Sequence, residues 1–134
     1  MLVDSSVWID FLRGGKSPET LLLKTSLDRG DPIWLAPPIL QEVLQGADSP
    51  QRLSKWDKAL GELPMVEDKD GRGLARAAAA IYAACRWQAF TPRSANDCLI
   101  AAYAIRSELP LLHRDRDFEH IALIEPRLKL LQPK

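Results

Sequence analysis

The sequence has 134 residues, with 18 Lys and Arg residues against 18 Asp and Glu residues, so its formal net charge at pH 7 is zero. Hydrophobic residues make up 46% and charged residues 27%, which is typical of a folded globular domain and excludes a disordered chain. The length predicts a single domain over residues 1–134, and the neutral balance excludes a uniformly basic surface that holds nucleic acid by bulk charge.

Short apolar segments alternate along the chain with longer helical patterns. In chain order, the expected elements are a strand at 2–3, a helix that Ser5 or Ser6 caps and that carries residues 7–12, a helix at 18–29, a strand at 33–36, helices at 39–45 and 50–60, a strand at 63–66, helices at 74–90 and 94–105, and strands at 109–112, 121–124 and 128–131. Four leucines of the second helix are expected to be buried: Leu21, Leu22, Leu23 and Leu27. Strands that alternate with helices predict an α/β domain with a mainly parallel sheet.

The uninterrupted apolar runs are too short for a membrane protein. The longest, residues 77–85 and 98–105, fall well below the roughly 20 residues that a spanning helix needs. No basic stretch precedes an apolar core at the amino terminus, so we expect neither a signal peptide nor a membrane segment. Cys85 and Cys98 lie in alanine-rich helical patterns, which favours buried, reduced thiols in a cytoplasmic protein over a disulfide or a metal pair.

Acidic residues fall where the predicted strands end or the next helices begin. Asp4 follows the first strand, Asp97 lies in the first turn of its helix, and Asp115 and Asp117 follow the strand at 109–112. Glu42 lies in the helix after the second strand, on an otherwise apolar face. Ligands of an open α/β sheet bind at the carboxyl ends of its strands, so we expect these acids to converge there. Taken singly, each is equally a turn former, a helix cap or a solvated charge.

Converging carboxylates repel one another, and a bound divalent cation removes that cost. Mg²⁺ and Mn²⁺ prefer oxygen ligands, and such an ion activates water and neutralises charge that develops on a phosphodiester. The predicted chemistry is therefore metal-assisted phosphodiester hydrolysis. Ser6 has two interpretations here, as a hydroxyl beside Asp4 or as an ordinary helix cap.

The acids lie in four segments: Met-Leu-Val-Asp-Ser-Ser-Val-Trp-Ile-Asp-Phe-Leu at 1–12, Gln-Glu-Val-Leu-Gln-Gly at 41–46, Ser-Ala-Asn-Asp-Cys-Leu-Ile-Ala-Ala at 94–102 and Leu-Leu-His-Arg-Asp-Arg-Asp-Phe at 111–118. These segments resemble PIN-domain proteins, especially the VapC-type toxins of bacterial toxin–antitoxin pairs. The resemblance covers the whole chain in the family's order and implies a PIN-like three-layer α/β/α sandwich.

The resemblance also implies roles for individual acids. The catalytic quartet would be Asp4, Glu42, Asp97 and Asp115. The residues that would hold Mg²⁺ or Mn²⁺ are Asp4, Asp97, Asp115 and Asp117. Ser6 matches a small hydroxyl residue that the family often carries two places after the first Asp. His113 departs from the pattern, because the family usually has Thr or Ser there, so a hydroxyl that would orient a carboxylate is missing.

The function implied by the resemblance is that of a Mg²⁺-dependent endoribonuclease that leaves a 5′-phosphate and a 3′-hydroxyl. It further implies a type II toxin with a cognate antitoxin protein, frequently a homodimer. Basic residues that flank the acids are candidates for RNA phosphate contacts, although each is equally an ordinary surface charge: Arg13, Lys16, Arg93, Arg114 and Arg116.

Other readings of the same residues stay open at this point. The chain could be a PIN-like nuclease with a housekeeping role in RNA processing, or a non-catalytic protein-binding module, although the full quartet argues against the latter. A metal-free ribonuclease would use His113 and His120 as acid and base. A phospho-acceptor signalling domain would need adjacent acids after the first strand, and Asp4 is followed by two serines. Large apolar residues are expected mainly in the core, with a fraction available for an antitoxin groove or a dimer face: Trp8, Phe11, Leu12, Trp34, Trp56 and Trp87.

Overall fold

The computed structural model describes residues 1–133, and its centre is a small parallel sheet. The strands β1 (Leu2–Val3), β2 (Leu111–Leu112) and β3 (Leu130–Leu131) pair side by side in that order, each in parallel with the next. Isolated parallel bridges extend this sheet beyond β1, from Leu2 to Trp34 and from Leu35 to Met65. Every strand pairing within residues 1–133 is therefore parallel, and the predicted mainly parallel sheet is confirmed.

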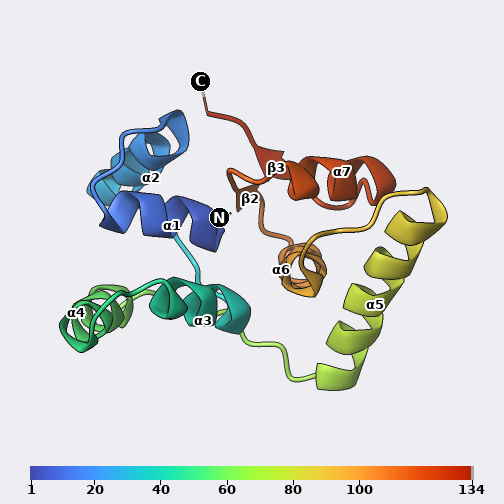
Figure 1. Cartoon of the computed structure of the whole chain (residues 1–134), viewed down its shortest axis with the longest axis horizontal. Coiled ribbons are helices and arrows are strands. Elements are labelled where there is room, and N and C mark those ends of the chain that lie inside the picture. Colours follow the sequence, from blue (N-terminus) through green and yellow to red (C-terminus); the bar gives the residue numbers. More distant parts are fainter. Residues whose placement is uncertain (134) are drawn as a thin grey trace.

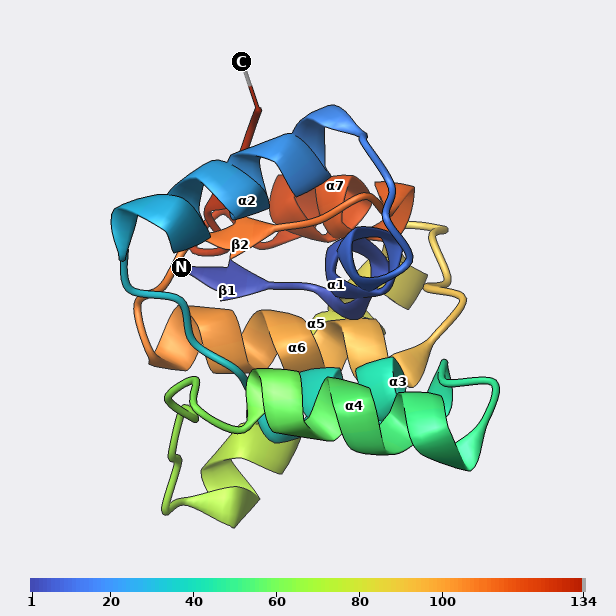
Figure 2. The same ribbon diagram turned by 90° about the vertical axis from the view of Figure 1, so that its left-hand side faces the viewer.

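Helices cover both faces of the sheet. They are α1 (Ser5–Leu12), α2 (Pro18–Arg29), α3 (Pro37–Gln45), α4 (Pro50–Leu60), α5 (Gly71–Trp87), α6 (Ala95–Arg106) and α7 (Arg116–Ile124). Figure 1 shows α1 and α2 on one side of the strands and α5, α6 and α7 on the other, with α3 and α4 below. Figure 2 shows β1 and β2 side by side in the middle of the molecule, with α1 starting where β1 ends. The arrangement is the expected three-layer α/β/α sandwich.

Side-chain caps begin several of these helices. Ser17 accepts from the Thr20 N–H at the start of α2, and Ser94 accepts from the Asn96 N–H at the start of α6. Asp4 and Asp115, two of the predicted site acids, cap α1 and α7 in the same way. The helix-cap interpretation of Asp4 is therefore correct, and Asp115 is a helix cap as well, whatever further role the two acids have.

One predicted strand is wrong. Residues 121–124 form the last turn of α7 and not a strand. The helical spacing becomes visible only when Phe118 is included, because Phe118 and Ile121 are both buried and lie three residues apart on one face of the helix. Four other predicted strands are shorter than expected: residues 109–112 and 128–131 each contribute two paired residues, and residues 33–36 and 63–66 contribute only isolated bridges.

The long alanine-rich helix also ends earlier than predicted. It stops at Trp87 and not at residue 90, because Ala89 takes a left-handed conformation with φ 60°. The Ala89 N–H then bonds to the Arg86 carbonyl and the Phe90 N–H to the Cys85 carbonyl. This is the Schellman arrangement of a helix end, which glycine usually supplies.

The core lies between the sheet and its helices. Trp8 and Trp56 are buried as expected, whereas Trp87 is 83% exposed. Leu21 is 53% exposed, so its predicted burial is wrong, because three consecutive leucines cannot all face one side of a helix. Cys85 and Cys98 are both buried and free, as predicted. Within residues 1–133, each helix is too short or too polar to cross a membrane.

Candidate metal centre

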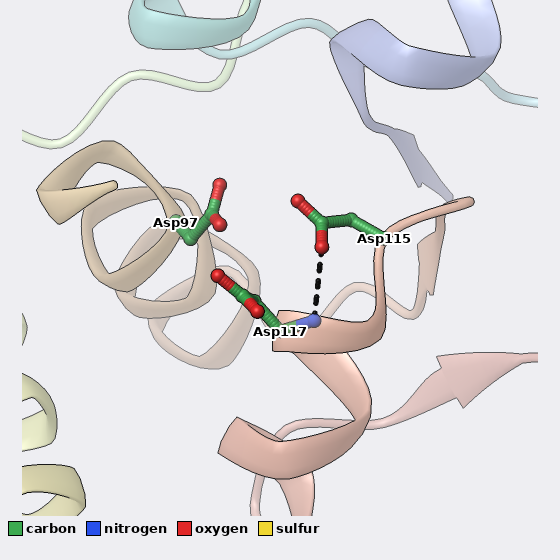
Figure 3. A group of neighbouring side chains, drawn as sticks. All are labelled: Asp97, Asp115 and Asp117. Atoms are coloured by element: carbon green, nitrogen blue, oxygen red, sulfur yellow. Dashed lines mark hydrogen bonds between the residues drawn. The ribbon is translucent and has the colours of Figure 1, made fainter. Parts of the chain in front are cut away.

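Three carboxylates meet where β2 leads into α7 and where α6 begins. One oxygen from each of Asp97, Asp115 and Asp117 lies within 4.8 Å of the other two. Figure 3 shows the Asp97 side chain reaching from α6 toward Asp115 and Asp117. The Asp117 N–H donates to Asp115 Oδ1 over 2.9 Å, and Asp97 and Asp117 are both buried. The predicted convergence is therefore present for these three acids.

Asp4 approaches the group from the end of β1. Its Oδ2 accepts from both the backbone N–H and the hydroxyl of Ser6, at 3.1 and 2.6 Å. Its Oδ1 is buried and has no hydrogen-bond partner among residues 1–133. Burial raises the pKa of the Asp4 carboxyl. A buried oxygen without a partner is costly and uncommon, so this atom is suited to bind an electropositive ligand.

Glu42 lies at the edge of the group, on α3. Its Oε1 accepts from the Ser5 hydroxyl at 3.4 Å. Burial, followed by the nearby charge of Asp4, raises the pKa of the Glu42 carboxyl, while hydrogen bonds from Ser5 and Asn96 lower it. Glu42 is close enough to affect the other acids but lies outside the group of three carboxylates within 4.8 Å of one another.

The pKa of the Asp97 carboxyl shows the effect of burial and of the neighbouring acids. Burial raises its pKa from 3.8 to about 8, and the negative charges of Asp115, Asp4, Asp117 and Glu42 contribute in that order. The metal-free carboxyl is therefore mostly protonated at neutral pH. Each of the other four predicted acids acts on it, so the five belong to one electrostatic unit.

Arg93 places a positive charge beside Asp115 and Asp117. Its backbone N–H donates to Asp117 Oδ2 at 2.9 Å, and its guanidinium lies 3.0 Å from Asp115 Oδ1 and 3.6 Å from Asp117 Oδ2. The side chain is 77% exposed. The structure thus puts this predicted RNA-binding arginine on the acids themselves.

The other predicted RNA-binding arginines have different surroundings. Arg13 donates to the Gly46 carbonyl, and Arg114 pairs with Asp10 and Glu19. Arg116 is exposed at the start of α7 and has no ion pair or side-chain hydrogen bond within residues 1–133. Arg116 is therefore the one of the four whose guanidinium is unengaged in that part of the chain.

Ser6 and His113 connect the strand ends to the acids. The Ser6 hydroxyl accepts from the Arg114 N–H at 3.3 Å while it donates to Asp4, which links the ends of β1 and β2. The buried His113 ring accepts from the Asp115 N–H through Nδ1 at 3.1 Å and packs against Phe118. His113 Nδ1 therefore holds the backbone of Asp115, whereas the missing hydroxyl was expected to orient a carboxylate.

Sequence reasoning missed two contributors to the site. Ser5 and Asn96 both hydrogen-bond Glu42, and each is a direct chain neighbour of a predicted acid, Asp4 or Asp97. Their polar side chains beside those acids were the available signal. Only the folded chain shows that both turn toward the same third residue.

The donor set fits a hard divalent cation. The converging ligand atoms are all carboxylate oxygens, which Mg²⁺ and Mn²⁺ prefer. The partnerless Asp4 Oδ1 and the raised pKa of Asp97 both show uncompensated negative charge, which a bound cation would neutralise. The acidic cluster is therefore suited to hold a divalent metal ion.

Comparison with known proteins assigns the chain to a family. The family model described as PIN domain matches residues 1–124. The VapC ribonuclease Mb1587 from Mycobacterium bovis and the ribonuclease VapC11 from Mycobacterium tuberculosis are each 37% identical over 125 residues, which is 92% of this chain and 92% of theirs.

Solved structures agree on the fold. A chain of VapBC2 from Rickettsia felis, solved bound to a DNA fragment from their promoter, matches 97% of this chain and 96% of its own with a TM-score of 0.75 and 18% identity. A chain of FitAcB from Neisseria gonorrhoeae matches 98% of this chain and 96% of its own with a TM-score of 0.69 and 18% identity. The chain belongs to the PIN-domain family and, within it, groups with the VapC ribonucleases.

Proposed function

We propose that this VapC-type nuclease is a Mg²⁺-dependent endoribonuclease and the toxin of a type II toxin–antitoxin pair. The observation that carries the proposal is the acidic cluster, in which oxygens of Asp97, Asp115 and Asp117 lie within 4.8 Å of one another and the charges of Asp4 and Glu42 also raise the pKa of Asp97. Repulsion among these carboxylates destabilises the folded chain when no metal is bound. A bound divalent cation removes that repulsion and so stabilises the fold.

Four aspartates would hold the ion: Asp4, Asp97, Asp115 and Asp117. When bound, Mg²⁺ supplies a water of lowered pKa and neutralises charge on the phosphodiester. Ser6 holds Asp4 Oδ2, which leaves the buried Oδ1 without a partner among residues 1–133 and available to a cation. His113 holds the backbone of Asp115, and the Arg93 N–H holds Asp117. These contacts set the carboxylates in place before the ion arrives.

Glu42 has a different role in this proposal. It lies outside the close group, and its pKa is raised, so it is a better proton acceptor than an ordinary glutamate. We assign it the removal of a proton from the attacking water. Ser5 and Asn96 orient its carboxylate for that purpose. The products would carry a 5′-phosphate and a 3′-hydroxyl.

The partners follow from the same proposal. The substrate is RNA, a cognate antitoxin protein covers or enters the site, and the chain forms a homodimer. The relatives named VapC and the VapBC2 structure support an antitoxin partner. Expression of the chain should arrest growth, and co-expression of a small DNA-binding protein encoded directly upstream should relieve that arrest, whereas a housekeeping processing enzyme would need no such relief. Light scattering should give twice the monomer mass.

Cleavage assays test the chemistry. The purified chain should cut RNA with Mg²⁺ or Mn²⁺ and stop in excess EDTA, and Asp4→Asn or Asp97→Asn should abolish both cleavage and toxicity. Asp57→Asn, on the exposed side of α4, is the matched control and should cleave like the unaltered chain. Cleavage that survives EDTA and leaves a cyclic phosphate would refute the metal mechanism and favour His113 and His120.

A further inference from the structure

A stacked aromatic pair lies beside the acidic cluster and has no part in holding it. The rings of Phe90 and His120 have centroids 4.6 Å apart and planes 24° apart, which is a stacked geometry. Phe90 comes from the segment between α5 and α6, and His120 comes from the exposed side of α7. The pair therefore joins two elements that both lead into the metal centre.

Each ring of the pair is connected to the acidic cluster through its own segment of the chain. His120 follows Asp117 by three residues on α7, about 4.5 Å along the helix axis. Phe90 precedes Arg93 by three residues, and the Arg93 backbone N–H is bonded to Asp117. The left-handed Ala89 and the Phe90 N–H bond to the Cys85 carbonyl hold Phe90 at the end of α5.

A basic side chain, Arg116, lies near the pair, and His120 is exposed to solvent. Arg116 lies four residues before His120, so the two share one face of α7. Its guanidinium is unengaged within residues 1–133, whereas that of Arg93 is held by Asp115 and Asp117. One face of the His120 ring is covered by Phe90, and the residue as a whole is exposed, so the other face is available to a ligand.

We propose that the Phe90–His120 pair, flanked by Arg116, is a base-stacking subsite for single-stranded RNA beside the metal centre. Every nucleobase has a flat aromatic face, and proteins bind single-stranded RNA by stacking such faces on aromatic side chains next to basic ones. The base would continue the stack on His120, and Arg116 would contact a neighbouring phosphate. This inference rests on the proposed ribonuclease function and adds how the substrate is held.

Two oligomers separate stacking from charge. A short fluorescein-labelled RNA and an abasic strand of the same length and charge would be bound to the protein in EDTA, with fluorescence anisotropy as the readout. His120→Ala should weaken binding of the RNA by about tenfold and that of the abasic strand by less than twofold, because only the RNA has bases to stack. His120→Phe should bind the RNA as the unaltered chain does.

Two further variants complete the design. Arg116→Gln should weaken both oligomers to the same degree, since it removes a phosphate contact. Leu21→Ala removes an exposed apolar side chain on α2, 53% exposed, and should change neither. Because His120 is exposed, its variants should keep the far-ultraviolet circular dichroism of the unaltered chain.

Several results would overturn the subsite. Equal loss of both oligomers in His120→Ala would make the residue a charge or fold determinant. Unchanged RNA binding together with an altered mass in solution would assign the pair to a protein interface. If the unaltered chain cleaves RNA with Mg²⁺ in either case, the subsite fails alone. If the unaltered chain neither binds nor cleaves RNA, the proposed function fails and the subsite with it.

Discussion

Replacing Asp97 with Asn should stabilise the metal-free protein while it destroys the proposed metal centre. In the folded chain, burial and four neighbouring acids raise the pKa of Asp97 to about 8, from 3.8. A folded-state pKa above the unfolded value means that the folded chain binds the proton more tightly. The stability contribution is therefore fully present below pH 3.8 and is lost as the pH rises from about 4 toward 8. Asparagine has nearly the same shape and no charge to lose.

The size of the gain follows from the same shift. Each pH unit between 3.8 and 8 would cost about 1.4 kcal/mol for an isolated group, and solvent access and sharing among neighbours reduce this by about half. We therefore expect Asp97→Asn to gain about 2–3 kcal/mol at pH 7.5 and about 1 kcal/mol at pH 5. At pH 7.5 the gain corresponds to a rise in Tm of about 9 °C for a chain of this length.

Urea unfolding and thermal melts in EDTA, at both pH values, measure these differences. Asp57→Asn on α4 controls for the loss of an exposed aspartate and should change Tm by little. Adding Mg²⁺ should then raise the Tm of the unaltered chain and leave that of Asp97→Asn unchanged, because a ligand stabilises only the state that binds it. A variant that is no more stable than the unaltered chain at pH 7.5, or whose advantage does not grow with pH, would refute the reasoning.

Three further substitutions test contacts around the site and at a helix end. Arg93→Ala removes the guanidinium from Asp115 and Asp117, so calorimetry should show severalfold tighter Mn²⁺ binding, whereas Arg13→Ala, with the same charge change, should not. His113→Ala leaves the Asp115 N–H without its acceptor and should cost about 1–2 kcal/mol in urea unfolding, and His113→Asn should recover part of this; equal losses would contradict the acceptor role. Ala89→Gly, at φ 60°, should raise the free energy of unfolding by about 1 kcal/mol, whereas Ala79→Gly within α5 should lower it by about 1 kcal/mol. A lower free energy of unfolding in both variants would show that Ala89 is unstrained.

The sequence predicted the elements whose signals are local. The helix predicted at 18–29 agrees with α2, because Pro18 begins it and the left-handed Gly30 ends it by their own chemistry. The strand predicted at 121–124 was wrong because a short apolar run carries no period of its own, and its burial depends on where Phe118 lies. Likewise, nothing in the residues around Ala89 forces a left-handed turn there, so the end of α5 depends on packing.

Some features of the candidate site were likewise predicted from the sequence, and others were not. Strand ends and the order of the acids predicted that Asp97, Asp115 and Asp117 would meet. The position of Arg93 was not predictable, because its partners lie more than twenty residues away in the chain and its exposed side chain reads as a surface charge. The role of His113 was hidden for another reason: the expected group was a hydroxyl that orients a carboxylate, and the ring nitrogen accepts the backbone N–H of Asp115 instead.

The double role of Asp4 and Asp115 decides how the site should be probed. Both cap helices through a carboxylate oxygen that accepts a backbone N–H, and asparagine caps a helix about as well as aspartate does. Asp115→Asn should therefore keep α7 and lose only charge, whereas Asp115→Ala loses the cap as well, at about 1 kcal/mol. A loss of cleavage in the alanine variant alone would report on the fold. A loss in both, with the asparagine variant as stable as the unaltered chain, would assign the carboxylate to the chemistry.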